Sequence, residues 1–190
     1  MRLGRRISFT LCAALAFFTA PTLTACQAAN VSASSASAKS TPVNIEHMPL
    51  KVFLVRHAEK TADKDDPALT QGGQERAALL SSMLKDAGIT HIHSSDYQRT
   101  RDTAAPLATR LGLSVDIYDP RDLPAMAAKL QASGGRHLVV GHSNTTGALT
   151  ELLGGHGGAP IVEASEYDRL YIVTRAADGS TNSTLLRFGE

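Results

Sequence analysis

The stretch Lys51–Lys60, KVFLVRHAEK, joins a run of apolar residues directly to a set of polar ones. The apolar run, Val52–Val55, predicts a strand that is buried on both faces, as in a sheet covered by helices. Four polar residues follow it: Arg56, His57, Glu59 and Lys60. Either the strand ends in a hydrated loop, or its end carries a functional site. The rest of the chain decides between these interpretations.

The first 25 residues are typical of a secretory signal peptide. A segment with three arginines precedes the apolar run ISFTLCAALAFFTA, which is too short to span a bilayer comfortably. The next residues, Leu23–Cys26 (LTAC), resemble the lipobox of bacterial lipoproteins, in which Cys26 would be lipidated and become the mature N-terminus. We therefore expect an anchor in the bacterial cell envelope, with the protein facing the periplasm. The alternative is a plain secretory signal in which Cys26 has no role.

The remaining chain has the composition of a tether followed by one soluble domain. Residues 26–48 contain the candidate lipidated cysteine and a Ser/Ala-rich segment, and residues 49–190 form the expected domain. Removal of residues 1–25 changes the formal net charge from +1 to −2, because 16 basic residues then face 18 acidic ones. No run rich in lysine and arginine remains, so we expect no nucleic-acid partner. The mature chain keeps one cysteine and can form no internal disulfide.

Strand and helix patterns alternate through the domain. Apolar periodicity and the positions of glycine and proline predict strands at 50–55, 89–95, 113–118 and 137–141. The helices are expected at 75–87, with Thr70 as a plausible N-cap, and at 97–111, 122–133 and 144–153. Residues 168–188 read as a hairpin around Asp178-Gly179. We therefore predict an α/β fold with a mostly parallel central sheet, helices on both faces and a C-terminal β-hairpin.

Polar side chains stand directly after each predicted parallel strand. In such sheets ligands bind beyond the carboxyl ends of the strands, so these side chains should meet at one edge. They are Arg56 and His57 after the first strand, Arg99 on the helix after the second, Asp119 after the third and His142 after the fourth. Any one of them alone would be an ordinary surface or structural residue. Their joint occurrence at successive strand ends favours a site.

This set of residues suits phosphoryl transfer. Arginine binds phosphate oxygens with two parallel hydrogen bonds, and a protonated histidine adds a further positive charge. A second, neutral histidine can attack phosphorus, and a carboxylic acid can protonate the leaving oxygen. This chemistry needs no cofactor, and no cluster with the spacing of metal ligands is evident, so we expect neither a metal nor a cofactor.

Four segments resemble motifs of the histidine phosphatase superfamily, which has the phosphoglycerate-mutase-like fold. They are LVRHAEK at 54–60, LTQGGQERA at 69–77, SSDYQRTRDTA at 94–104 and VVGHSN at 139–144. The resemblance implies that His57 is the nucleophile that becomes phosphohistidine. It also implies that Arg56, Arg99 and His142 bind the phosphoryl group, with His142 counted among the catalytic residues.

The general acid does not transfer from the family. The mutase-like branch usually has a glutamate after the third strand, where this chain has YDPRDLP at 118–124. We expect Asp119 to be the acid, with Asp122 as the second choice. Glu59 is a further alternative, although we expect it to orient the pocket loop instead. A second branch places its acid directly after the second histidine, and Ser143 stands there in this chain.

The resemblance implies a metal-independent phosphomonoester hydrolase of the small phosphatase type, with a phosphorylated small molecule or a phosphoprotein as substrate. A phosphomutase is less favoured, because the chain has no room for the insertions of larger mutases. A non-catalytic phosphate-binding lipoprotein is the alternative from another class. Outside the site, we expect Arg101 to form salt bridges. We expect His91 and His93 to lie at the surface or to support the site.

Overall fold

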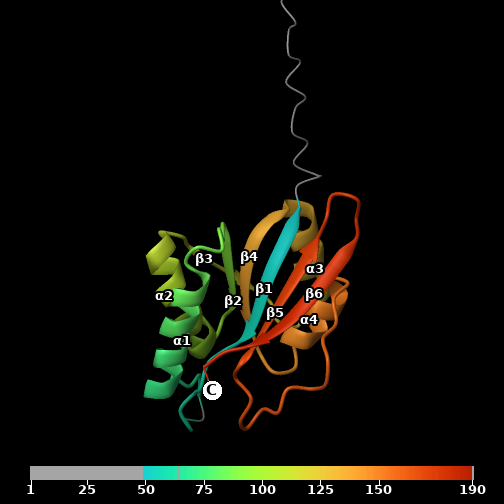
Figure 1. Cartoon of the computed structure of the whole chain (residues 1–190). Coiled ribbons are helices and arrows are strands. Elements are labelled where there is room, and N and C mark those ends of the chain that lie inside the picture. Colours follow the sequence, from blue (N-terminus) through green and yellow to red (C-terminus); the bar gives the residue numbers. More distant parts are fainter. Residues whose placement is uncertain (1–48, 64, 190) are drawn as a thin grey trace, which may run out of the picture. The chain divides into compact units, whose positions relative to one another are not determined.

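The computed structural model describes residues 49–63 and 65–189, which form one α/β domain (Figure 1). The expectations about the signal peptide, Cys26 and the tether fall on residues 1–48 and lie outside the described part. Its elements are β1 (Leu50–Arg56), α1 (Gln71–Leu84), β2 (His91–Ser95), α2 (Gln98–Leu111), β3 (Val115–Tyr118), α3 (Leu123–Ser133), β4 (Gly135–Gly141), α4 (Thr146–Leu152), β5 (Arg169–Arg175) and β6 (Thr181–Arg187). None of the helices in this part has both the length and the apolar character needed to cross a membrane.

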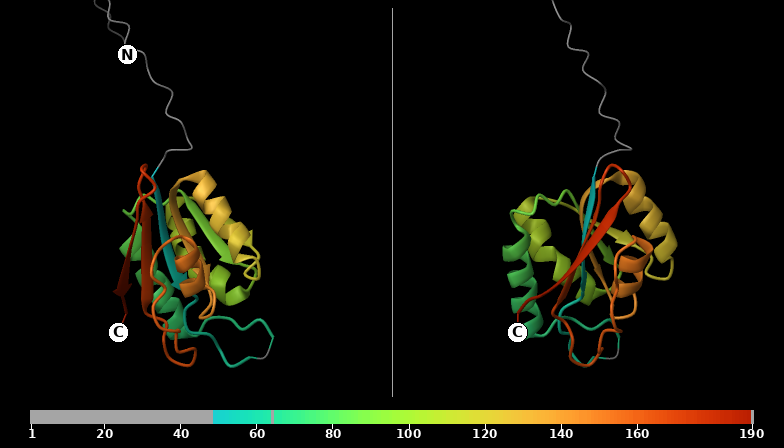
Figure 2. Two further views of the ribbon diagram at one scale, coloured as in Figure 1. Left: turned by 90° about the vertical axis from the view of Figure 1, so that its right-hand side faces the viewer. Right: turned by 45° about the vertical axis from the view of Figure 1, so that its right-hand side comes forward.

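The six strands form one sheet in the order β3-β2-β4-β1-β5-β6. The strands β1 to β4 run parallel to one another, whereas β5 pairs antiparallel with β1 and forms a hairpin with β6. The two views of Figure 2 show this hairpin at one side of the sheet. The predicted mostly parallel sheet with a C-terminal hairpin is therefore confirmed.

The central residues of β1, Val52–Val55, are all apolar because both faces of the strand are covered there. Val52 and Leu54 pack with α3 and α4 on one face, and Phe53 and Val55 pack with α1 and α2 on the other. Figure 1 shows the two helix pairs on opposite sides of the sheet. Successive side chains of a strand point to opposite faces, so a strand between two helical layers favours apolar residues at successive positions.

Local sequence explains where the helices begin and end. Thr70 caps α1 as expected, with its hydroxyl accepting a hydrogen bond from Gly73 N at 3.1 Å. Asp122 caps α3 in the same way through Ala125 N at 3.0 Å. Gly112 ends α2 with a φ of 66°, a left-handed conformation that favours glycine.

Two expectations need adjustment at β2. The strand begins at His91, not Ile89, although Ile89 is buried beside it in the core. His93 does not lie at the surface but is buried, because the ring of His137 on β4 stacks on it with centroids 5.3 Å apart. Arg101 forms ion pairs with Asp66 and Asp96, as expected.

The carboxyl ends of the parallel strands fix the position of the candidate site. In the pairing of β1 with β4, Arg56 is opposite Gly141, so His57 and His142 are the next residues on the two neighbouring strands. His57 N donates to Gly141 O at 2.9 Å and extends this pairing by one step. The register of two adjacent strands thus brings two histidines together that are far apart in the sequence.

Candidate active site

A cleft of about 460 Å³ lies at the carboxyl edge of the sheet. Its lining includes three of the four residues assigned to the phosphoryl pocket, His57, Arg99 and His142, together with Lys60, Tyr97 and Glu163. The two histidine rings meet edge to face, with their centroids 5.5 Å apart. Three of the five residues expected to meet at this sheet edge therefore line one cleft, whereas Arg56 and Asp119 are not among its lining residues.

His57 has a defined tautomer. Its Nδ1 lies 2.8 Å from the carbonyl oxygen of Ala58, and only a protonated nitrogen can donate to a carbonyl. The lone pair of the neutral ring is therefore on Nε2. Burial lowers the pKa of His57 to about 3, although the hydrogen bond to Ala58 opposes this, and the charge of Arg56 lowers the pKa further. The ring stays neutral near pH 7 and keeps a free electron pair.

His142 is held by a chain of hydroxyl groups. Ser95 donates its proton to Thr100 Oγ1 at 3.1 Å, so its oxygen accepts from His142 Nε2 at 2.8 Å. Burial, followed by the charges of Arg99 and Arg56, lowers the pKa of His142 to about 4. A bound dianion would oppose both effects and favour the protonated ring. A dianion bound in the cleft would thus favour a positive charge on His142.

Arg99 reaches the cleft from the first turn of α2. Its guanidinium lies over the ring of Tyr97, 4.4 Å from the centroid, and Asp66 Oδ1 lies 3.8 Å away. The ring of Tyr97 also meets that of His142 at nearly a right angle, with centroids 5.0 Å apart. Tyr97 therefore orients both a cation and a histidine of the site, which the sequence analysis missed.

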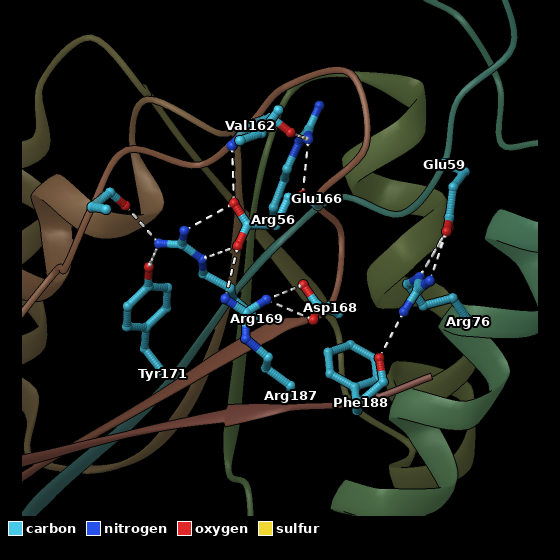
Figure 3. Close-up of polar contacts among 11 residues, drawn as sticks. Arg56, Glu59, Arg76, Val162, Glu166, Asp168, Arg169, Tyr171, Arg187 and Phe188 are labelled. Atoms are coloured by element: carbon cyan, nitrogen blue, oxygen red, sulfur yellow. Dashed lines mark hydrogen bonds and ion pairs between the residues drawn. The ribbon is translucent and has the colours of Figure 1, made fainter. Parts of the chain in front are cut away.

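Arg56 lies next to His57, but the loop between α4 and β5 holds one side of its guanidinium (Figure 3). Its Nη1 donates to Glu166 O at 3.0 Å and to Val162 O at 3.5 Å, and the ring of Tyr167 packs 4.0 Å from its central carbon. Its Nε and Nη2 are buried and have no hydrogen-bond partner among the described residues. Such donors would be satisfied by phosphate oxygens.

The two aspartates considered as general acid do not line this cleft. Asp119 lines a neighbouring hollow and forms two hydrogen bonds of 2.9 Å with the guanidinium of Arg121. These bonds lower its pKa, the opposite of what a proton donor needs. Asp122 is used as the cap of α3. The position of Asp119 therefore does not support its expected role, because the Asp119 carboxylate is bound to Arg121 and lines the neighbouring hollow.

Glu59 has the supporting position that we expected. Its carboxylate receives hydrogen bonds from Arg76 Nε and Nη2 at 2.8–3.0 Å, as Figure 3 shows. Burial alone would raise the pKa of Glu59, but the bonds from Arg76 lower it overall. Arg76 Nη1 also donates to Phe188 O at 2.7 Å, so the pair ties the loop after β1 to α1 and to the C-terminal segment.

Glu163 and Lys60 also line the cleft and were not identified from the sequence as site residues. Lys60 ends the segment Lys51–Lys60, which also contains His57, so the sequence already placed these two residues near each other. Glu163 lies in the loop between α4 and β5, which matches no motif. Only the folding of that loop over the strand ends brings it to the cleft.

Comparison with known proteins supports this interpretation. Residues 52–121 match the profile of the histidine phosphatase superfamily (branch 1). Among curated proteins, the chain is 40% identical over 79 residues to a probable phosphoglycerate mutase GpmB of Erwinia tasmaniensis, covering 38% of this chain and 36% of that protein. A protein of the same name from Escherichia fergusonii is 39% identical over 79 residues. The matches span about a third of the length of these relatives.

Solved structures share the fold. The protein histidine phosphatase SixA complexed with tungstate superimposes with a TM-score of 0.56 and 23% identity, over 72% of this chain and 94% of that one. A mycobacterial glucosyl-3-phosphoglycerate phosphatase gives a TM-score of 0.55 and 15% identity, over 74% and 98% of the two chains. The matched segment is thus similar to the histidine phosphatase superfamily (branch 1), and the solved structures show that this domain shares their fold.

Proposed function

We propose that the domain is a metal-independent phosphomonoester hydrolase that works through a phosphohistidine on His57. The observation that carries the proposal is the state of this residue. His57 is 3% exposed, its Nδ1 is occupied by Ala58 O, and its Nε2 is left with a lone pair in a cleft that Arg99 and His142 also line. That arrangement suits nucleophilic attack on a phosphoryl group whose charge is offset by neighbouring cations.

Hydrolysis is favoured over a mutase reaction by the extent of the comparisons. Two solved structures named as phosphatases share the fold over more than nine tenths of their own length. We infer that the substrate is a phosphorylated small molecule or a phosphoprotein. We also propose that Cys26 carries a lipid anchor, so that the domain would act in the cell envelope, facing the periplasm, on substrates available there.

The proposal is tested with the purified full chain and nitrophenyl phosphate. We expect phosphate release that persists in EDTA, because no step needs a metal. His57→Ala should abolish both turnover and the acid-labile phosphoryl label on the protein. The matched control is His156→Ala, which changes an exposed histidine that is not part of the cleft and should leave both intact. Loss of wild-type activity in EDTA, or an unchanged label in His57→Ala, would contradict the mechanism.

A further inference from the structure

The charged side chains that line the cleft are cations or histidines with one exception. Lys60, Arg99 and Arg121 are cationic, and Glu163 is the one carboxylate that lines it in the described part of the chain. We propose that Glu163 is the proton donor to the leaving group and the proton acceptor in the hydrolysis of the phosphoenzyme. This inference rests on the proposed phosphatase function and assigns a role that Asp119, Asp122 and Glu59 do not fill in this geometry.

The depth of the two residues in the cleft supports the assignment. His57 is buried at the end of β1, whereas Glu163 is exposed at the mouth. In phosphoryl transfer the attacking and leaving atoms lie roughly in line on opposite sides of phosphorus. A nucleophile on the floor therefore directs the leaving oxygen outward, toward the mouth. A carboxyl group there can reach that oxygen without passing the phosphoryl group.

The backbone that carries Glu163 is held in place. Val162 O accepts hydrogen bonds from Ser165 N at 3.2 Å and Glu166 N at 2.8 Å, which puts Glu163 at the corner of a turn. The Glu166 carboxylate accepts from Val162 N at 2.9 Å and pairs with Arg169 at 2.6 Å. Figure 3 shows these contacts of Glu166 and those of the neighbouring Arg56 guanidinium. The turn is thus anchored on both sides of Glu163.

The same loop couples Glu163 to the phosphoryl pocket. Arg56 Nη1 donates to Glu166 O in this turn, and the negative charge of Glu163 acts on the Arg56 guanidinium and opposes the lowering of its pKa by burial. Glu163 is therefore close to a cation expected to hold phosphoryl oxygens.

The proposed steps balance. In the first, the Nε2 lone pair of His57 forms a bond to phosphorus while the bond from phosphorus to the ester oxygen breaks, and the Glu163 carboxyl gives its proton to that oxygen. In the second, water attacks phosphorus, the Glu163 carboxylate takes one of its protons, and the bond between phosphorus and Nε2 breaks. The products are an alcohol, phosphate and neutral His57, with Glu163 protonated again.

Glu163→Gln provides the test, with two substrates of different leaving groups. Glycerol phosphate needs protonation of its alkoxide, whereas nitrophenolate leaves without help. We expect phosphoenzyme formation from glycerol phosphate to fall about 100-fold or more, and that from nitrophenyl phosphate to fall less than about 10-fold. Because dephosphorylation also uses Glu163, labelled phosphoenzyme should accumulate in this variant during turnover of the nitrophenyl ester. Inhibition by tungstate should be unchanged or stronger, which reports an intact pocket.

Asp119→Asn is the matched control, since it removes a competing carboxylate that lines the neighbouring hollow and not the cleft. It should lower both rates by similar small factors. An equal loss on both substrates in Glu163→Gln would overturn the assignment, as would a loss selective for glycerol phosphate in Asp119→Asn. An active wild type with an unaffected Glu163→Gln refutes only this inference. A wild type inactive on both esters contradicts the proposed function as well.

Discussion

Three histidine rings stack across β2 and β4. His91 and His93 lie against His137, with centroid distances of 4.7 and 5.3 Å. His137 Nε2 lies 2.6 Å from Gly134 O and must donate to it, so its Nδ1 accepts from His93 Nε2 at 3.0 Å. This leaves the buried Nδ1 of His93 without a hydrogen-bond partner among the described residues, 3.9 Å from Asp116 Oδ2.

The buried histidines of this stack predict that the folded domain loses stability in acid. Burial, then the charges of His137 and Lys129, lower the pKa of His93 to about 4, although Asp116 opposes this, and burial also lowers the pKa of His137. The unfolded chain binds protons from about pH 6.5 downward, whereas the folded chain resists until about pH 4. The contribution of the neutral His93 to the free energy of unfolding is therefore complete above pH 6.5. Protonation of this residue should lower that free energy by roughly 3 kcal/mol as the pH falls to about 4.

Urea denaturation at pH 7 and pH 4.5 measures this effect. His93→Gln keeps a donor for His137 but cannot titrate, so the difference in unfolding free energy between the two pH values should shrink. The exposed His156→Gln serves as the control and should leave that difference unchanged. An undiminished pH difference in His93→Gln would show that other groups cause the acid sensitivity.

The sequence identified those site residues that follow strands within short motifs. To predict that His57 and His142 lie close together, it was enough to infer that β1 and β4 are parallel, because parallel strands have their carboxyl ends at one edge of the sheet. It could not identify Glu163, whose loop has no periodicity and is placed by a turn and by Arg56. The sequence also could not show that Arg121 binds the carboxylate of Asp119, because nothing in YDPRDLP indicates this contact.

At the scale of the elements, the start of α1 packs very closely against the loop that follows β1. A Cβ added at Gly73 would lie 2.2 Å from the backbone oxygen of Glu59, whereas one at Gly72 would meet only Thr70 Oγ1 at 3.9 Å. Glycine at 73 therefore lets the helix backbone pack directly against the segment that follows His57. The sequence placed this helix correctly from its cap and its periodicity, but it could not show which of the two glycines is a contact.

The two glycines give a matched pair of variants. Gly73→Ala should lower the free energy of unfolding by about 1–3 kcal/mol, because backbone must move to admit the methyl group. It should also reduce turnover, since the displaced segment carries Glu59 beside the site. Gly72→Ala should be neutral or stabilising by up to about 1 kcal/mol, because alanine favours the helix. Denaturation midpoints compare them, and equal effects of the two variants would contradict the close contact.

At the scale of the whole molecule, the chain contains two cysteines, and their expected roles differ. Cys12 lies inside the apolar run of the expected signal peptide, and Cys26 ends the LTAC segment. If Cys26 is lipidated, Cys26→Ser should move the protein from the membrane fraction to the soluble one, because two or more acyl chains are needed for stable attachment. Cys12→Ser is the matched control and should stay membrane-bound. Continued attachment of Cys26→Ser would refute the anchor.

The sheet order also has a kinetic consequence. The strand β1 emerges first from this domain, yet its neighbours are β4 and β5, where Leu50 pairs with Gly135 and Arg175. Contacts between such distant parts of a chain form slowly, and an apolar strand without partners is prone to aggregate. The strand that bears His57 must wait for nearly the whole domain to be synthesised. His57, the proposed nucleophile, is thus among the first residues of the domain to be synthesised and among the last to reach its final position.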